Sequence, residues 1–334
     1  MKLRFVLVVA LVAASTRAGA QANTCPAGTG SLDPNRITQD ACQMAVDVFK
    51  YMAPQLGVAL AGGNPTLGQG GTLGGLGHFT IEARANVLAG DLPQVQNFPQ
   101  PSTTGTVSPP HTLPTKTQIV GLPTVDAAIG IFKGIPLGLT NVGGVDLLVD
   151  AAYIPSYGSS GSEVQVKPNQ SLQLGFGARV GILQESLLVP GVAVTYLRRD
   201  LPTTSIIGTS SGVDVNVTNA SVKTDALRLT ASKNLLLFSL AAGVGRDHYD
   251  ESASVQGTVH TSPATTVSSS QIPLDQKMTR TTYFLDASLN FIIGKLIAEV
   301  GQVSGGSATT YNAFTGGAAD KSRLYGSVGI RLGF

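Results

Sequence analysis

The last twelve residues of the chain, Arg323 to Phe334, alternate regularly between two kinds of side chain. Successive side chains of a β-strand point to opposite faces. One face would carry Leu324, Gly326, Val328, Ile330, Leu332 and Phe334, and the other Arg323, Tyr325, Ser327, Gly329, Arg331 and Gly333. The pattern predicts a strand with lipid on its apolar side and a polar interior on the other side.

The same alternation recurs upstream and predicts about ten strands in total. Long polar loops follow the odd-numbered strands, whereas short turns such as Lys233-Asn234 and Gly294-Lys295 follow even-numbered ones. Transmembrane barrels have this asymmetry, with short periplasmic turns and long external loops. The predicted strands are 79–87, 119–132, 145–154, 172–182, 192–198, 213–231, 236–247, 283–293, 296–303 and 323–334.

The predicted fold is therefore all-β, a closed antiparallel transmembrane barrel of about ten strands, within a range of about 8 to 14. An even number lets the first and last strands pair and removes the exposed edges. The alternative is a soluble β-sandwich or β-solenoid with one buried face. Only 13% of residues are charged, against about 25% in ordinary globular chains, and this favours the membrane. The chain has no Trp, so aromatic girdles would need Tyr and Phe.

An export signal is predicted over residues 1–20. Lys2 and Arg4 begin it, Phe5 to Ala14 forms an apolar run, and Ala18-Gly19-Ala20 is a small-residue cleavage site. Cleavage after Ala22 fits as well. Beyond this segment no run of apolar residues has the length of a membrane-spanning helix.

Charge argues against nucleic acid as a partner. Removing Lys2, Arg4 and Arg17 from the 22 basic residues leaves 19, against 20 acidic residues. The mature chain is then nearly neutral, and its charges do not cluster on a basic face.

Residues 21–76 are predicted to form a helical and glycine-rich extension, and 77–334 the barrel. Apolar residues from Ile37 to Met52 recur at helical spacing, with Asp33 or Thr38 as the cap and Pro54 as the end or a kink. The opposite face is polar and carries Gln39, Asp40, Gln43, Asp47 and Lys50. This helix must bury its apolar stripe, either as a plug in the lumen, as a cap on the periplasmic mouth or against a partner.

Cys25 and Cys42 are the only cysteines. After export into an oxidising compartment, we expect them to form a disulfide that ties the helix to the amino-terminal end.

The export signal, the alternating strands and the ending Gly329-Ile330-Arg331-Leu332-Gly333-Phe334 resemble a Gram-negative outer-membrane β-barrel protein. The resemblance implies location in the outer membrane, with the bilayer and the barrel-assembly machinery as partners. It also implies an assembly signal in the closing strand, formed by Tyr325, Val328, Ile330, Leu332 and Phe334. A helical, glycine-rich extension before the barrel is similar in layout to the long-chain fatty-acid transporters.

Nine charged residues take the parity of the barrel interior. They would either form a structural polar core, with opposite charges paired, or line a selective pore. The predicted lumen residues are Glu82, Arg84, Asp146, Asp150, Arg179, Asp286, Glu299, Arg323 and Arg331.

No catalytic, cofactor or metal site is predicted. Asp247 and His248 suggest a protease-like pair, but adjacent residues on a strand point to opposite faces. The glycine-rich stretch lacks a phosphate-binding motif, and no Gly-x-Ser-x-Gly elbow lies between a strand and a helix. We therefore expect a porin-like channel or transporter for small or hydrophobic solutes, without enzymatic activity. The alternatives are a non-conducting structural or surface-interaction barrel and, as a minor option, an outer-membrane hydrolase.

Overall fold

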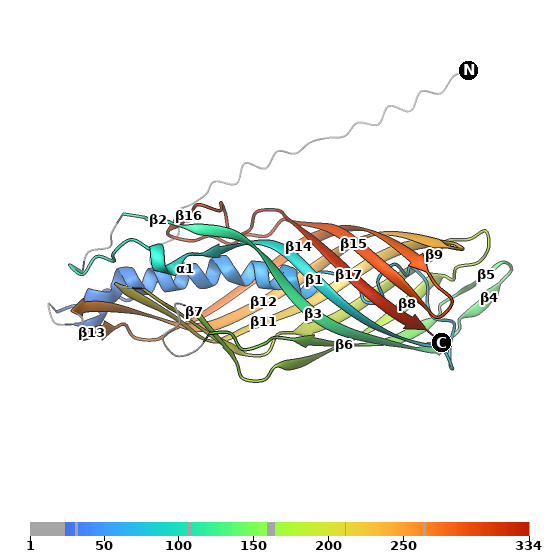
Figure 1. Ribbon diagram of the computed structural model, residues 1–334, viewed down its shortest axis with the longest axis horizontal. Coiled ribbons are helices and arrows are strands. Elements are labelled where there is room, and N and C mark those ends of the chain that lie inside the picture. Colours follow the sequence, from blue (N-terminus) through green and yellow to red (C-terminus); the bar gives the residue numbers. More distant parts are fainter. Residues whose placement is uncertain are drawn as a thin grey trace, which may run out of the picture.

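The computed structural model describes residues 24–30, 33–105, 109–158, 164–210, 212–262 and 265–333. The predicted export signal and Phe334 lie outside these residues. Ten strands form the wall of the molecule, and one helix, α1 (Pro34–Ala61), lies along its long axis (Figure 1). The wall strands are β1 (Phe79–Pro93), β3 (Thr115–Phe132), β6 (Val145–Tyr153), β8 (Leu172–Leu183), β9 (Gly191–Asp200), β11 (Val213–Leu235), β12 (Phe238–Ser262), β14 (Ile272–Asn290), β15 (Gly294–Ser304) and β17 (Arg323–Gly333).

The ten strands form a closed ring. Each pairs antiparallel with its neighbours in the order β1, β3, β6, β8, β9, β11, β12, β14, β15 and β17, and β17 returns to β1 with Ala85 opposite Val328. The ring confirms the predicted closed antiparallel barrel of about ten strands. Each predicted strand corresponds to one member of the ring.

The outer surface of the ring is apolar at the end where the carboxyl-terminal strand finishes. On β14, Leu285 and Leu289 are exposed, whereas Asp286 between them is buried. The other wall strands repeat this alternation, as lipid outside and a polar interior require. No helix in the described part of the chain has the length and apolar character needed to cross a membrane.

The ends of several strands differ from the prediction. The tight turns lie at Leu236-Leu237 and at 291–293, not at Lys233-Asn234 and Gly294-Lys295. Much of the chain between the predicted strands 236–247 and 283–293 is also strand, because β12 and β14 pair well beyond the apolar belt. The connections also contain short elements: β2 (Thr112–Leu113), β4 (Ile135–Leu137), β5 (Thr140–Val142), β7 (Val164–Pro168), β10 (Thr204–Thr209), β13 (Thr265–Ser268), β16 (Ala313–Phe314) and the 3-10 helix η1 (Val95–Asn97).

A register shift in β11 changes which residues face inward. The pairing with β12 slips between Thr218 and Ser221, where Asn219 has a φ of 53°. Val217 faces inward before the shift, and Val222 after it. A bulge of this kind switches the inward parity from odd to even positions.

Helix α1 is longer than predicted and runs through Pro54. Its first turn is capped by Asp33, whose side chain accepts a hydrogen bond from the Asn35 N–H at 2.9 Å. Thr38 lies inside the helix and donates to the Pro34 carbonyl. Pro54 removes one main-chain hydrogen bond, but packing on all sides maintains the helix beyond it.

The polar face of α1 is buried as well as the apolar one. Gln39, Asp40, Gln43, Asp47 and Lys50 are all buried, because the connections between strands cover this side of the helix. Their hydrogen-bond partners come from distant segments. Asp47 accepts from the N–H groups at positions 311 and 312, and Asp40 from that at position 102. Burial raises the pKa of Asp47, while these N–H donors act in the opposite direction.

An apolar core surrounds α1 at the end of the barrel that carries β7 and β13 (Figure 1). The inner faces of β11 and β12 contribute Val215, Val217, Val255 and Val259 to this core. Gly257 lets the helix lie against β12, since a Cβ there would come within 2.3 Å of the Ala41 backbone. Long connections lie at this end and short turns at the other, so by barrel convention it is extracellular. We call this part the extracellular head.

The predicted disulfide is present. Cys25 and Cys42 are bonded, with a Cα–Cα distance of 6.0 Å. The bond joins the chain segment before the helix to its third turn, and both cysteines belong to the apolar core of the head.

Candidate functional site

Three arginines of the barrel wall meet the carboxyl-terminal end of α1. Arg84 donates to the Gly62 carbonyl at 3.0 Å, and Arg228 donates to the Ala61 carbonyl. Arg199 donates to three carbonyls, at positions 60, 61 and 63, each at 3.3 Å. The last carbonyls of a helix have no partner within the helix and carry its negative dipole end. The arginine cluster (Arg84, Arg199 and Arg228) satisfies them in the middle of the lumen.

Buried aspartates balance the arginine cluster. Asp126 and Asp150 lie between Arg84 and Arg199, with N–O distances of 3.2 Å from Arg84 to Asp150 and 3.3 Å from Arg199 to Asp150. Arg228 pairs with Asp247 at 3.5 Å. All these side chains are almost inaccessible to solvent. Buried charges are stable only when they are paired and hydrogen-bonded, and here the helix terminus supplies further acceptors to each of the three arginines.

Beyond the helix, the glycine-rich segment 62–77 continues through the lumen toward β1. Its backbone is satisfied by side chains of the wall, as a buried main chain requires. Gly70 N–H donates to Ser232 Oγ at 2.8 Å, and other N–H groups bind carboxylates. These pairs are Asn64 with Glu299 at 3.0 Å, Gly68 with Asp286 at 3.2 Å, and Leu73 with Asp146 at 3.1 Å.

The structure places all nine predicted lumen residues on the inner face of the barrel, where they are buried. They form several separate groups. Arg179 pairs with Asp146 at 2.6 Å, and Arg331 lies opposite Glu82 in the strand register. Arg323 lies nearer the extracellular end and pairs with Asp91 at 3.1 Å, a residue that the sequence reasoning did not select.

Sequence reasoning also missed further charged residues of the lumen, among them Asp126, Arg199, Arg228 and Asp247. Alternation extended one residue further along β9 would have found Arg199, which lies just beyond the predicted strand. Asp126 has the inward parity of β3, but Pro123 made that strand uncertain. Arg228 was obscured by the register shift in β11.

The residues predicted to form an assembly signal divide between two faces. Val328, Ile330 and Leu332 point outward and are exposed. Tyr325 is buried in the lumen, where its hydroxyl donates to Glu299 at 2.8 Å. Phe334 lies outside the described residues.

The Asp247-His248 dipeptide has the geometry expected of neighbours on a strand. Asp247 is buried in the lumen and accepts a hydrogen bond from Thr282, whereas His248 is exposed on the outer face beside Thr279. The two side chains do not converge. Within the described ranges, no group of His, Cys, Asp and Glu residues has a metal-binding arrangement.

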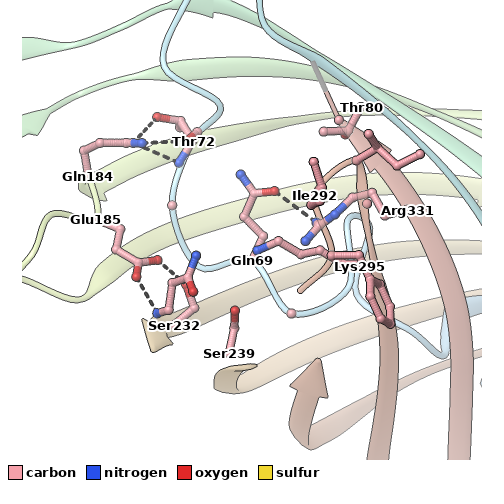
Figure 2. Close-up of a pocket in the computed structure, with 17 residues that line it drawn as sticks. Gln69, Thr72, Thr80, Gln184, Glu185, Ser232, Ser239, Ile292, Lys295 and Arg331 are labelled. Atoms are coloured by element: carbon pink, nitrogen blue, oxygen red, sulfur yellow. Dashed lines mark hydrogen bonds between the residues drawn. The ribbon is translucent and has the colours of Figure 1, made fainter. Parts of the chain in front are cut away.

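A polar pocket opens at the periplasmic mouth, with a volume of about 320 Å³. The end of the glycine-rich segment forms one wall, and the ends and turns of the barrel strands form the others (Figure 2). Thr72 is bound there by Gln184, and Gln69 accepts a hydrogen bond from Arg331 at 3.0 Å. Lys295 extends toward the same side of the pocket as Arg331 (Figure 2).

No family model matches the sequence, and no curated protein matches it. The transport unit of the autotransporter AIDA-I from Escherichia coli is 8% identical, with 88% of this chain and 99% of that chain covered and a TM-score of 0.34. The Ralstonia pickettii toluene transporter TbuX is 10% identical, with 81% and 92% covered and a TM-score of 0.30. An anion-selective porin from Comamonas acidovorans is 11% identical, with 77% and 98% covered and a TM-score of 0.19.

All three TM-scores lie below 0.5, so these likenesses assign no family to the chain. The closed antiparallel ring, its apolar exterior and its polar, filled interior are the features of an outer-membrane β-barrel. The protein has that architecture and that location.

Proposed function

We propose that the protein is an outer-membrane barrel that is closed to solutes in its resting state and presents a rigid extracellular head for interaction at the cell surface. The observation that carries the proposal is the filled lumen. Helix α1 is buried on all sides in the head, and the glycine-rich segment is hydrogen-bonded to the wall below it. We also propose that the barrel has no enzymatic activity.

The dimensions of β12 support an extracellular head. Its 25 residues span about 80 Å along the strand, whereas the apolar belt of an outer-membrane barrel is about 25 Å tall. Outward-facing side chains are apolar from Phe238 to Val244 and become polar from Arg246 onward. More than half of this strand therefore extends beyond the membrane, and its inner face packs on α1.

Solute transport is the second candidate, and the glycine-rich segment favours it. This segment contributes little apolar burial and is held mainly by individual hydrogen bonds to wall side chains such as Ser232 and Asp286. A passage would open only if both this segment and the end of α1 moved. The arginine cluster opposes such movement, because withdrawing the helix would leave three buried guanidinium groups without their carbonyl partners.

Single-channel recording in planar bilayers tests the closed state. We expect the mature protein to give no conductance steps above those of the lipid alone, because α1 and the glycine-rich segment fill the lumen. Steady steps typical of an open pore would favour a porin instead.

Thiol labelling on intact cells tests the position of the head. The native cysteines are bonded to each other, so an introduced cysteine is the only free thiol. Thr266→Cys on β13 should react with a membrane-impermeant maleimide on intact cells. Leu236→Cys, in a short turn at the opposite end, should react only after the outer membrane is permeabilised. The reverse pattern would contradict the proposed orientation.

A further inference from the structure

The polar pocket at the periplasmic mouth is not needed to close the lumen, and its lining is chemically uneven. One side is cationic. Lys295 on β15 lies directly opposite Arg331 on β17, and Arg331 lies opposite Glu82 on β1. The two basic side chains are thus neighbours on the inner wall, and the buried carboxylates of Glu82 and Asp286 lie close enough to act on Arg331.

Lys295 is the cation available to a ligand. It forms no ion pair with any described residue, whereas Arg331 donates to the Gln69 amide oxygen and lies opposite Glu82 in the strand register. Glu82 is almost fully buried behind Arg331 and does not line the pocket. Figure 2 shows Lys295 and Arg331 extending from adjacent strands toward Gln69. This corner of the pocket therefore favours an anionic group.

One carboxylate, Glu185, lies on the opposite wall of the pocket. Its oxygens are engaged by the Asn234 N–H and by the Ser232 hydroxyl, which is 3.4 Å away. Figure 2 shows Glu185 directed toward Ser232. Its charge stabilises a turn and also acts on Lys295 from across the pocket, without forming an ion pair with it.

The lip of the pocket is apolar and belongs to the lipid-facing surface. Phe291, Ile292 and Ile293 line it, and Ile292 is fully exposed. The next turn, Leu236-Leu237, is also exposed and is joined to the end of β14 by a hydrogen bond from Asn290 N–H to the Leu237 carbonyl at 2.8 Å. Both turns continue the outward apolar rows of their strands, so the lip lies where the periplasmic leaflet meets water.

We infer that this pocket binds an anionic phospholipid of the periplasmic leaflet, with the headgroup phosphate at Lys295 and Arg331 and the acyl chains against the lip at 291–293. A soluble anion would use the cations and leave the lip exposed, whereas a neutral lipid would use the lip and leave Lys295 unpaired. An anionic amphiphile satisfies both. Basic pockets at the membrane boundary bind phosphate headgroups through the same forces. The inference rests on the proposed orientation of the barrel, but not on a role of the extracellular head in surface interaction.

Native mass spectrometry of the mature protein tests this inference. The protein in mild detergent is incubated with equimolar dioleoyl phosphatidylglycerol and dioleoyl phosphatidylethanolamine, and the retained lipids are counted. We expect one phosphatidylglycerol to be retained in preference to phosphatidylethanolamine. Lys295→Gln should weaken this preference about five-fold, which corresponds to about 1 kcal/mol, the size of one lysine's interaction with an anionic lipid surface.

Two further arms separate the alternatives. Lys277→Gln removes a lysine from the extracellular half of β14 and should leave retention unchanged. Ile292→Ser keeps the cations and should weaken retention of the lipid, since it removes apolar contact with the acyl chains. Equal retention of both lipids, or an equal effect of the two lysine substitutions, would overturn the inference. If soluble glycerol phosphate displaced the lipid completely, the assignment of a lipid would be wrong and the pocket would be a site for a small anion.

Discussion

The two halves of the lumen are filled by different chemistry. In the extracellular head, α1 packs against valines and other apolar side chains from the inner faces of the strands. Within the membrane-embedded half, the same strands present arginines and aspartates, and the chain that fills the space is mostly main chain. An apolar stripe on a helix can be buried by an apolar wall, whereas exposed backbone needs polar partners. The composition of the wall therefore matches the secondary structure of the segment inside it.

Removing a buried charge from the membrane-embedded half should cause the largest loss in the free energy of unfolding. Arg84→Met leaves Asp126 and Asp150 with only Arg199 and leaves the Gly62 carbonyl without its donor. We expect a loss of about 3–5 kcal/mol in the free energy of unfolding, measured by circular dichroism in detergent with urea.

Arg198→Met is the matched control, because Arg198 is on β9 and about half exposed on the outer face. It should cost less than about 1 kcal/mol. Equal losses of unfolding free energy in the two variants would show that the arginine cluster does not hold α1 and the glycine-rich segment in the lumen.

Removing the disulfide tests the stability of the extracellular head. The bond closes a loop with a sequence separation of 17. Replacing both Cys25 and Cys42 with Ser should destabilise the head by about 3 kcal/mol on a chain-entropy account. Thermal unfolding of the wild type with and without reductant provides the check. The wild type should lose stability on reduction, and the double variant should not respond to the reductant.

Packing in the head gives the next effect. Gly257→Val pushes a branched side chain into the backbone of α1 near Ala41. We expect destabilisation of about 1–3 kcal/mol, seen as a lower unfolding temperature by circular dichroism. Ser252→Val, on the outward side of the same strand, should leave the temperature nearly unchanged. A tolerated Gly257→Val would mean that the helix does not lie against β12.

The smallest effect is expected on the outer surface of the head. Lys277 and Asp250 form an ion pair at 3.2 Å, but both side chains are well exposed. Lys277→Gln should change the free energy of unfolding by less than about 0.5 kcal/mol, because solvent screens such pairs. Urea unfolding at low and at high salt provides the measurement, and a loss comparable to that of Arg84→Met would be inconsistent with this screening.

The strand pattern in the sequence was enough to predict the ring, because lipid on one side forces alternation at every position. The same rule failed where a bulge reverses the parity, as between Thr218 and Ser221, so Arg228 was missed. Helical periodicity found α1 but not its surroundings. The partners of the polar face could not be predicted, because residues such as Asn312, which binds Asp47, are 265 positions away in the chain. Pro54 does not end the helix, because tertiary packing maintains the helical backbone beyond this residue.

The central claim is that α1 is an integral part of the barrel interior. Hydrogen exchange of the mature protein in detergent, read by mass spectrometry, tests this most directly. We predict that the amides of residues 38–61 are protected to the same degree as those of the wall strands, because a helix buried on all sides exchanges only when the barrel opens. Exchange of the whole helix within seconds, while the strands remain protected, would contradict the account.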